Sequence, residues 1–304
     1  MHYVLGFDGG GTKTECVLMN SADQVLARTY AGPSNPSRIG VESAVRAVEE
    51  SADLALRDAG LERSAIAAIG AGLAGTAKPD MKERVRCALQ KSFAGATVTV
   101  LTDLDVALAA VGEGPAIILV AGTGSAAMGR NARNEMWRAG GYGRGVSDQG
   151  SAFDIGRRAV AAAAQERAKV GKDTSLGRLI LARLGLVEWQ AVQHRAQTMP
   201  DEIYPPIFPV VAAAADAGDA TARELLRGAA NELGLLIGEV ADRLDLRGKE
   251  FALVKIGGMI GRSRFFDAQI DDALKQVVPS AQMGKLRISP AEAAALAARG
   301  SDAG

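Results

Sequence analysis

A strand–turn–strand–turn pattern occurs twice in this sequence, and it constrains the fold more than any other feature. The expected strands cover residues 3–7, 16–19 and 25–30, and then 116–121, 126–128 and 136–138. Gly11 and Gly122 are 111 residues apart, and so are Gly32 and Gly143. Chance spacing of turn glycines is the alternative in a chain with 36 glycines, but the order of strands and turns also agrees. The pattern therefore predicts two copies of one three-stranded unit.

Helices and buried strands are expected after each copy of this unit. Apolar periodicity predicts helices over 44–56, from 79, from 103 and over 291–299, and strands over 66–73, 97–101 and 251–256. Residues 151–247 read as mostly helical. Four prolines interrupt that helical stretch between positions 200 and 209, so we expect a loop there.

The chain length predicts more than one domain. A chain of 304 residues fits about two domains, and the boundary is expected near 112–115. We expect a first domain over residues 1–112, on which a C-terminal helix at 290–304 can pack back. Residues 113–289 then form a second domain with a helical insertion.

Composition excludes several classes of function. The 35 basic and 35 acidic residues leave no net charge, and aromatic residues are only 4%. Neither the positive surface nor the stacking platform of a nucleic-acid binder is therefore expected. Cys16 and Cys87 form no CxxC pair, which excludes a disulfide scaffold and favours a reducing compartment. His2 and His194 are the only histidines, so a catalytic centre built on Ser–His or His–metal pairs is not expected.

The sequence shows neither a secretory leader nor a membrane span. Its start lacks a basic segment and reaches an acid and three glycines before any long apolar run. The longest strongly apolar stretch, near 116–121, is far shorter than a span. We expect a soluble cytoplasmic protein that binds neither membrane nor nucleic acid.

Three apolar strands run directly into glycine-rich turns, and these turns predict a nucleotide site. Such turns let backbone N–H groups approach phosphate oxygens closely. The candidate phosphate-binding residues are Gly9, Gly10, Gly11, Thr12, Lys13, Thr14, Gly122, Thr123, Gly124, Ser125, Gly257 and Gly258. Asp8, at the end of the first strand, is the candidate Mg²⁺ residue and would act through water. The alternative is that each turn is only a tight hairpin, and Lys13 also reads as a solvated lysine.

Two familiar phosphate motifs do not match. Gly6 and Gly11 have P-loop spacing, but Thr12 stands where the motif needs lysine. Gly122 and Gly124 begin a dinucleotide-binding pattern, but a turn follows where that pattern needs a helix. The remaining interpretation is a phosphate-binding site built from hairpin turns. Phosphoryl transfer depends mainly on positioning and charge neutralisation, so a site poor in histidine can perform it.

Several motifs, taken in order, resemble those of the actin-like ATPase superfamily. They are Gly6–Thr14, Gly32–Pro36, Ala71–Gly75, Leu101–Asp103, Ala121–Ser125, Gly140–Ser151, Ile256–Gly258 and Pro290–Ala294. Within the superfamily the chain resembles the BadF/BadG/BcrA/BcrD ATPase family, especially its bacterial glucosamine and N-acetylglucosamine kinases. The resemblance implies an α/β fold of two ribonuclease H-like domains with an interdomain cleft. It also implies the use of ATP and Mg²⁺.

The resemblance assigns a role to each matching polar residue. Asp103 matches the acid that accepts the proton of the sugar 6-hydroxyl, although its position also suits a helix N-cap. Asp105 is the fallback and is expected to face solvent. Asn35 and Asp148 match sugar-binding residues, although both also suit turns. The resemblance places Gly75, Tyr142, Ser147 and Gln149 in the same substrate site.

The substrate is expected to be a small amino sugar. Ser147-Asp148-Gln149 and Ser34-Asn35-Pro36 resemble glucosamine kinases more than N-acetyl-specific ones, so we expect glucosamine 6-phosphate as product. N-acetylglucosamine and N-acetylmuramic acid are the alternatives, and Ala293 replaces a common glycine and leaves the adenine site open. An ATP-driven activator of a dehydratase and a sugar-sensing module are further alternatives. A homodimer is also possible within the family.

Overall fold

The computed structural model describes residues 3–143, 146–171 and 174–300, and the chain in it forms two compact units. The first unit contains the residues up to Glu113 together with those from Leu286 onward, and the second contains Gly114–Lys285. Positions 144–145 of the Gly140–Ser151 motif and positions 301–304 of the expected last helix lie outside the described residues. The boundary between two domains near position 112 stays a prediction.

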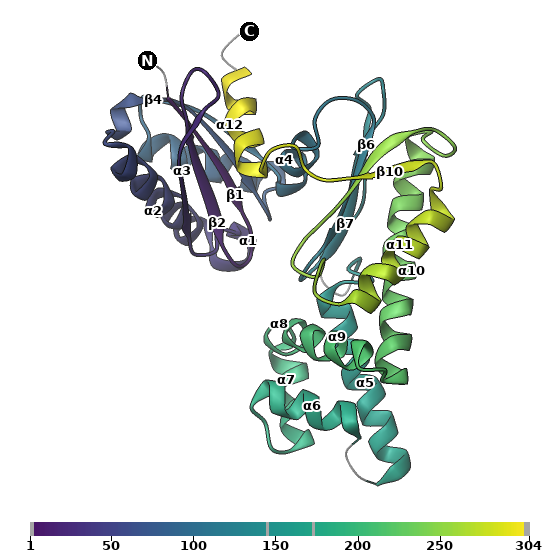
Figure 1. Cartoon of the computed structure of the whole chain (residues 1–304). Coiled ribbons are helices and arrows are strands. Elements are labelled where there is room, and N and C mark those ends of the chain that lie inside the picture. Colours follow the sequence, from purple (N-terminus) through teal and green to yellow (C-terminus); the bar gives the residue numbers. More distant parts are fainter. Residues whose placement is uncertain (1–2, 144–145, 172–173, 301–304) are drawn as a thin grey trace. The chain divides into compact units, whose positions relative to one another are not determined.

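The first unit is built on a five-stranded mixed sheet in the order β3-β2-β1-β4-β5 (Figure 1). Its elements are β1 (Tyr3–Gly9), β2 (Thr14–Met19), β3 (Val25–Ala31), α1 (Pro36–Ile39), α2 (Val41–Ala59), η1 (Arg63–Ala65), β4 (Ile66–Leu73), α3 (Pro79–Ser92), β5 (Thr97–Leu101), α4 (Asp103–Ala109) and α12 (Pro290–Gly300). Strands β1, β2 and β3 pair antiparallel, whereas β4 and β5 run parallel to β1. Alternate residues of β1 therefore enter two separate apolar layers, with Leu5 on the side of α2 and α3 and Val4 on the side of α12.

Helix α12 packs on this sheet at two glycines. A Cβ atom at Gly6 would overlap the carbonyl oxygen of Ala291, and one at Gly70 would overlap that of Ala294. The alanines of α12 complete the close contact, and Ala291, Ala294 and Ala295 are all buried. Glycine on the strands and alanine on the helix therefore let the two backbones approach without a gap.

The second unit repeats the same sheet. Its elements are β6 (Ala116–Ala121), β7 (Ser125–Arg130), β8 (Met136–Gly140), α5 (Ala152–Val170), α6 (Ser175–Leu184), α7 (Trp189–Thr198), α8 (Pro200–Ile203), η2 (Pro205–Ile207), α9 (Phe208–Asp216), α10 (Ala220–Arg243), β9 (Phe251–Ile256), α11 (Arg264–Val277) and β10 (Ala281–Gly284). The order β8-β7-β6-β9-β10 matches β3-β2-β1-β4-β5 of the first unit strand for strand, with the same parallel and antiparallel pairs. The predicted internal repeat is therefore confirmed.

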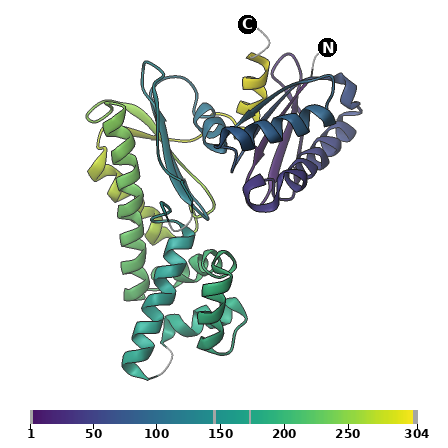
Figure 2. The same ribbon diagram turned by 180° about the vertical axis from the view of Figure 1, so that it is seen from behind.

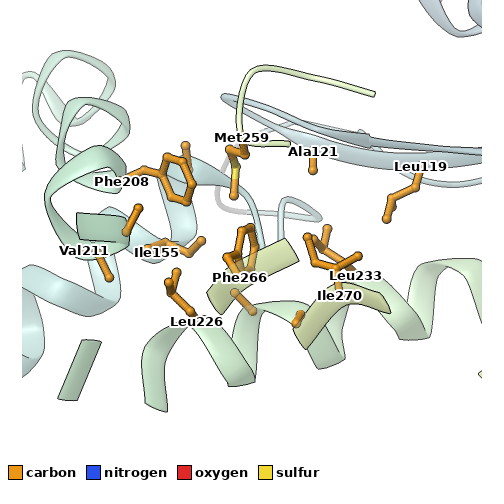
Figure 3. Packing of buried hydrophobic residues seen from close by; sticks show 14 of the residues in the cluster. Leu119, Ala121, Ile155, Phe208, Val211, Leu226, Leu233, Met259, Phe266 and Ile270 are labelled. Atoms are coloured by element: carbon orange, nitrogen blue, oxygen red, sulfur yellow. The ribbon is translucent and has the colours of Figure 1, made fainter. Parts of the chain in front are cut away.

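A large apolar core joins the second sheet to its helices. Leu119 and Ala121 of β6 share this core with Ile155 of α5, Leu233 of α10 and Phe266 of α11 (Figure 3). Helices α5 to α9 extend beyond the sheet as a helical subdomain, which is visible from both sides in Figures 1 and 2. None of the helices in the described residues is long and apolar enough to cross a membrane.

The expected loop at the four prolines is wrong. Pro200 opens α8, Pro205 opens the η2 turn, and Pro209 lies in the first turn of α9. Proline is tolerated in the first turn of a helix because the N–H that it lacks would have no partner there. The prolines therefore begin three short helical segments and do not interrupt one.

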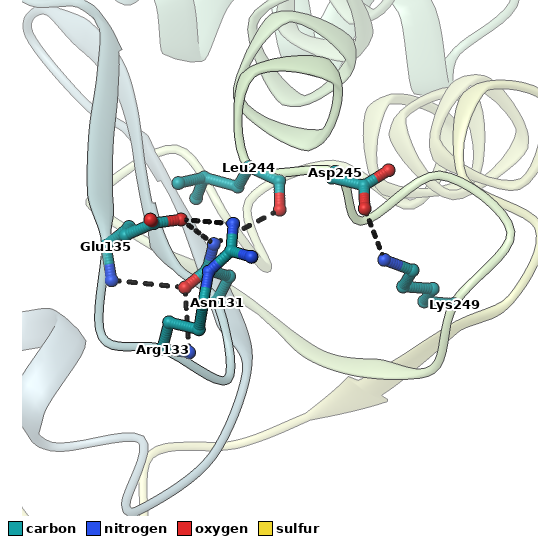
Figure 4. A network of polar contacts seen from close by, with 6 residues as sticks. All are labelled: Asn131, Arg133, Glu135, Leu244, Asp245 and Lys249. Atoms are coloured by element: carbon teal, nitrogen blue, oxygen red, sulfur yellow. Dashed lines mark hydrogen bonds and ion pairs between the residues drawn. The ribbon is translucent and has the colours of Figure 1, made fainter.

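The turn between β7 and β8 is held by one asparagine. The Asn131 side-chain oxygen accepts from the N–H groups of Arg133 and Glu135, at 2.9 and 3.1 Å, and its amide donates to the Glu135 carboxylate at 2.6 Å (Figure 4). The same amide lies 3.5 Å from the carbonyl oxygen of Leu244, just after α10. This network fixes the predicted turn against the end of the long helix.

Candidate active site

Two carboxylates of the first unit lie at the same edge of its sheet. Asp8 of β1, Gly72 of β4 and Leu101 of β5 are level with one another in the strand register, and Asp103 follows two residues after Leu101. The carboxyl ends of parallel strands commonly carry the binding residues of α/β proteins. A Cβ at Gly72 would overlap the side chain of Val106, so glycine lets α4 pack closely here. The sheet and α4 thus bring the predicted metal residue and the predicted base together.

Asp103 is not the N-cap of α4, so the expectation that it could cap this helix is wrong. Thr102 is the N-cap: its hydroxyl accepts from Asp105 N at 3.1 Å, and the Asp105 carboxylate accepts from Thr102 N at 2.9 Å. This reciprocal capping box also corrects the expectation that Asp105 faces solvent. Asp103 occupies the first helical position, where the helix dipole favours a negative charge.

The pKa of Asp8 is raised from 3.8 to about 7. Burial is the main cause, and the negative charges of Asp103 and Glu15 add to it, while Lys13 opposes it. Burial and the neighbouring negative charges therefore disfavour the ionised form of Asp8.

The shift predicts how the stability of the ligand-free protein depends on pH. Because the folded-state pKa of Asp8 is raised, its contribution to stability is present below about pH 4 and is lost as the pH rises to about 7. We expect the melting temperature of the wild type to fall relative to that of Asp8→Asn across this window. Parallel melting curves of the two proteins from pH 4 to 8 test this. A constant difference between them would contradict the raised pKa.

The turn between β1 and β2 is held by backbone hydrogen bonds. Gly10 N donates to Lys13 O at 3.0 Å, and Ser34 N donates to Gly10 O at 3.0 Å. Ala74 N donates to Gly9 O at 2.8 Å. Gly11, Thr12 and Lys13 at the tip are exposed. The tip is therefore a firmly held turn whose outer backbone faces solvent, as a phosphate-binding turn requires.

Thr14 does not lie at the open tip. Its side chain is fully buried, and its hydroxyl donates to the Gly32 carbonyl and lies 2.7 Å from Ser34 Oγ. These contacts indicate that Thr14 fastens the turn to the segment after β3. A direct phosphate contact by Thr14 stays a prediction.

Asn35 and Gly75 are adjacent in the first unit, as a shared substrate site would require. The Asn35 side chain caps α1 by accepting from Ser37 N at 3.0 Å. Ser37 Oγ donates to Gly75 O at 2.9 Å. Gly75 has φ +86°, and a Cβ there would lie 3.0 Å from the side-chain carbon Cγ of Asn35. Only glycine therefore fits beside this asparagine.

Two of the glycine turns meet in the second unit. Strands β6 and β9 are parallel neighbours, so the turns after Ala121 and Ile256 lie at one edge of the sheet. Met259 N donates to Ala121 O at 3.1 Å, and a Cβ at Gly122 would lie 3.8 Å from Gly258 N. The predicted nucleotide residues of this unit thus form one cluster.

Asp148 lies against the first of these turns. It is buried, and its carboxylate accepts from Ser125 N at 3.4 Å and lies 3.0 Å from the position of a Cβ at Gly124. Ser125 Oγ donates to Gln149 O at 2.7 Å. The structure therefore brings the predicted sugar residues 148 and 149 next to predicted phosphate residues.

Tyr142 and Ser147, which follow β8, are joined by a hydrogen bond. Tyr142 N donates to Ser147 Oγ at 2.7 Å, and the Tyr142 hydroxyl donates to Arg138 O at 3.1 Å. The Arg138 guanidinium lies over the Tyr142 ring, 5.1 Å from its centre. Most of the tyrosine remains exposed, at 65%. One ring face is thus occupied by Arg138, a contact that the sequence alone gave no signal to find.

The two cysteines lie on separate elements. Cys16 is fully buried in β2, and burial raises the pKa of its thiol far above the usual range. Cys87 is exposed on α3. A buried thiol in the middle of a sheet cannot reach a cluster at the surface, so Cys87 is the one cysteine of the two that is placed to ligate such a cluster.

The paired sheets and their glycine turns define an α/β protein with the two-domain fold of actin-like sugar kinases. The BadF/BadG/BcrA/BcrD ATPase family model matches residues 5–298, and the chain belongs to that family.

Similar proteins include several kinases. An N-acetylmuramic acid/N-acetylglucosamine kinase from Clostridium acetobutylicum is 29% identical over 303 residues, covering 98% of this chain and 99% of that protein. A glucosamine kinase from Vibrio cholerae is 27% identical over 244 residues, covering 78% and 80%. The structure of a candidate N-acetylglucosamine kinase from Chromobacterium violaceum is 26% identical, covers 97% of this chain and 98% of that chain, and superposes with a TM-score of 0.80.

Proposed function

We propose that this protein transfers the γ-phosphoryl group of ATP to the 6-hydroxyl of an amino sugar, with glucosamine as the preferred substrate. The observation that carries the proposal is the pair of carboxylates, Asp8 and Asp103, at the sheet edge beside the open β1–β2 turn. Membership of an ATPase family and likeness to amino-sugar kinases support the same reaction.

Asp103 is proposed as the general base. Its carboxylate accepts the proton of the sugar 6-hydroxyl while the hydroxyl oxygen forms a bond to the γ-phosphorus. The bond from that phosphorus to the β,γ-bridging oxygen breaks, and ADP leaves with the bonding electrons. The products are the sugar 6-phosphate, ADP and one proton.

Asp8 is proposed to hold Mg²⁺ through water. Mg²⁺ usually binds to one or two carboxylates and to substrate phosphates, and it keeps several of its waters. Asp8 fits this pattern because it is partly buried close to the charges of Asp103 and Glu15, which a divalent cation would offset. When bound, Mg²⁺ supplies positive charge to the phosphate oxygens.

The second unit is proposed to bind the nucleotide. Gly122–Ser125 and Gly257-Gly258 offer backbone N–H groups at one sheet edge, where glycine allows a close approach of phosphate and ribose. In the first unit, the exposed tip of the β1–β2 turn is proposed to bind phosphate oxygens. The homodimer and the cytoplasmic location stay predictions.

The residues of the substrate motifs favour glucosamine over the other amino sugars. Ser147-Asp148-Gln149 and Ser34-Asn35-Pro36 resemble the glucosamine kinases of the family, and a glucosamine kinase is among the similar proteins. N-acetylglucosamine remains the second substrate to test, because another similar protein is named for it.

An ADP-release assay over a panel of sugars tests the proposal. Purified protein, ATP and Mg²⁺ are mixed in turn with glucosamine, N-acetylglucosamine, N-acetylmuramic acid and glucose. We expect the highest kcat/KM for glucosamine. A higher value for N-acetylglucosamine would overturn the substrate preference and keep the kinase. ADP release that no sugar raises above the sugar-free rate would overturn the kinase itself.

A further inference from the structure

We propose that Arg38 contacts the phosphoryl group during its transfer and stabilises the charge that develops there. The inference rests on the proposed kinase function and adds to it a residue that the sequence motifs do not single out. Arg38 belongs to α1, which lies at the end of the first unit where β1 passes into β2 (Figure 1). Its guanidinium reaches the turn that is proposed to hold the terminal phosphates.

The backbone of Arg38 is firmly placed. Arg38 N donates to Asn35 O at 3.0 Å within α1, whose first residue is a buried proline. Asn35 caps this turn, and Ser37 ties it to Gly75. A short helix that is fixed at both of these points holds the base of the Arg38 side chain in one position.

The guanidinium lies against Gly11. A Cβ at Gly11 would be only 2.6 Å from Arg38 Nη1 and 3.7 Å from Cζ. Gly11 is exposed at the tip of the β1–β2 turn, so the cation and the open backbone of the turn face the same space. Phosphate oxygens held by this turn would therefore lie within reach of the guanidinium.

Arg38 has the charge available for this role. Within residues 3–143, 146–171 and 174–300, its guanidinium forms neither an ion pair nor a hydrogen bond, and its side chain is exposed. Lys13, at the same turn, lies over the Tyr30 ring, 4.9 Å from its centre. Arg28 is paired with both Glu15 and Glu292. Arg38 is thus better placed than these two cations to receive an anion at the turn.

Arginine suits this chemistry better than lysine. Its planar fork can bind two oxygens of a phosphoryl group at once, and its charge persists at any physiological pH. Asn35 and Arg38 are three residues apart, as the N-cap and a residue of the single turn of α1. The residue proposed to bind the sugar and the cation proposed to bind the phosphoryl group are therefore held by the same helical turn. Binding of the sugar at Asn35 would therefore steady the arginine.

Three variants test the assignment. Arg38→Met removes the charge and keeps the length of the side chain, and Arg38→Lys keeps the charge without the fork. Arg46→Met is the matched control, because Arg46 is an exposed arginine on α2 and Arg38 is the arginine that lies against Gly11. We expect Arg38→Met to lower kcat by about 100-fold, the usual cost of one lost donor to a transition state. The KM for the sugar should change by less than about threefold, because a donor used in the transition state contributes little to ground-state binding.

The controls separate the possible outcomes. Arg38→Lys should recover about tenfold of the lost kcat, because a point charge replaces only part of the fork. Arg46→Met should match the wild type in every parameter. The assignment is overturned if kcat of Arg38→Met stays near the wild-type value, or if the loss appears only in the KM for the sugar. It is also overturned if the melting temperature falls with kcat and lysine restores neither. A wild-type protein without sugar-dependent ADP release would instead defeat the proposed function.

Discussion

Replacing Asp103 by asparagine is expected to lower kcat for sugar phosphorylation by about 1000-fold, within the range that a general base contributes. An amide of the same shape cannot accept the proton of the sugar 6-hydroxyl. The hydroxyl oxygen would then attack phosphorus without losing its proton to a base, and the transfer would be slower. ATP binding should persist, because the turns of the second unit are untouched. The measurement is steady-state ADP release, together with binding of a non-hydrolysable ATP analogue.

The same variant has a second readout. The charge of Asp103 raises the pKa of Asp8, so the pKa of Asp8 should fall from about 7 when that charge is removed. Asp105→Asn is the matched control, since Asp105 forms the capping box of α4 and its amide oxygen can still accept from Thr102 N. Near-normal turnover of Asp103→Asn would show that Asp103 is not the base.

Replacing Gly257 by valine is expected to disrupt the proposed nucleotide-binding turns of the second unit. Gly257 has φ +111°, and a Cβ there would overlap the carbonyl oxygen of Ala121 and lie 2.9 Å from Ala121 N. The hydrogen bond from Met259 N to that carbonyl would also be lost. Backbone strain and overpacking together should cost about 3 kcal/mol of stability.

Denaturant unfolding and nucleotide titration measure this effect. We expect at least tenfold weaker binding of ATP, corresponding to about 1.4 kcal/mol. Gly258→Ala is the control for stability, because a Cβ at Gly258 has no neighbour within 4 Å and its φ is not positive. If Gly257→Val were as stable as Gly258→Ala, the close approach of β9 to β6 would not depend on glycine.

The sequence predicted the sheets well because their signals are local. Alternating apolar runs and glycine turns repeat at 111 residues, and each predicted strand appears in the matching sheet position. The prediction was wrong where two rules of local structure apply to the same residues, as at the prolines and at the start of α4. Prolines that begin short helices were read as helix breakers, and both Thr102 and Asp103 had the chemistry of an N-cap. Only the backbone geometry separates these alternatives.

The candidate site was predictable as a set of residues but not as a set of contacts. Asp8 and Asp103 are 95 residues apart in the chain, and parallel strand pairing brings Leu101, two residues before Asp103, level with Asp8. The burial of Thr14 and the position of Arg38 against Gly11 depend on how α1 and the segment after β3 fold back over the first turn. No local pattern encodes such long-range packing.

Identification of the product tests the central claim most directly. Glucosamine, ATP and Mg²⁺ are incubated with the protein, and the mixture is followed by phosphorus and proton NMR. The account predicts one new phosphomonoester whose phosphorus couples to the two protons on carbon 6 of the sugar, formed in equal amount with ADP. Inorganic phosphate as the only new phosphorus product, or a phosphate on another sugar oxygen, would contradict it.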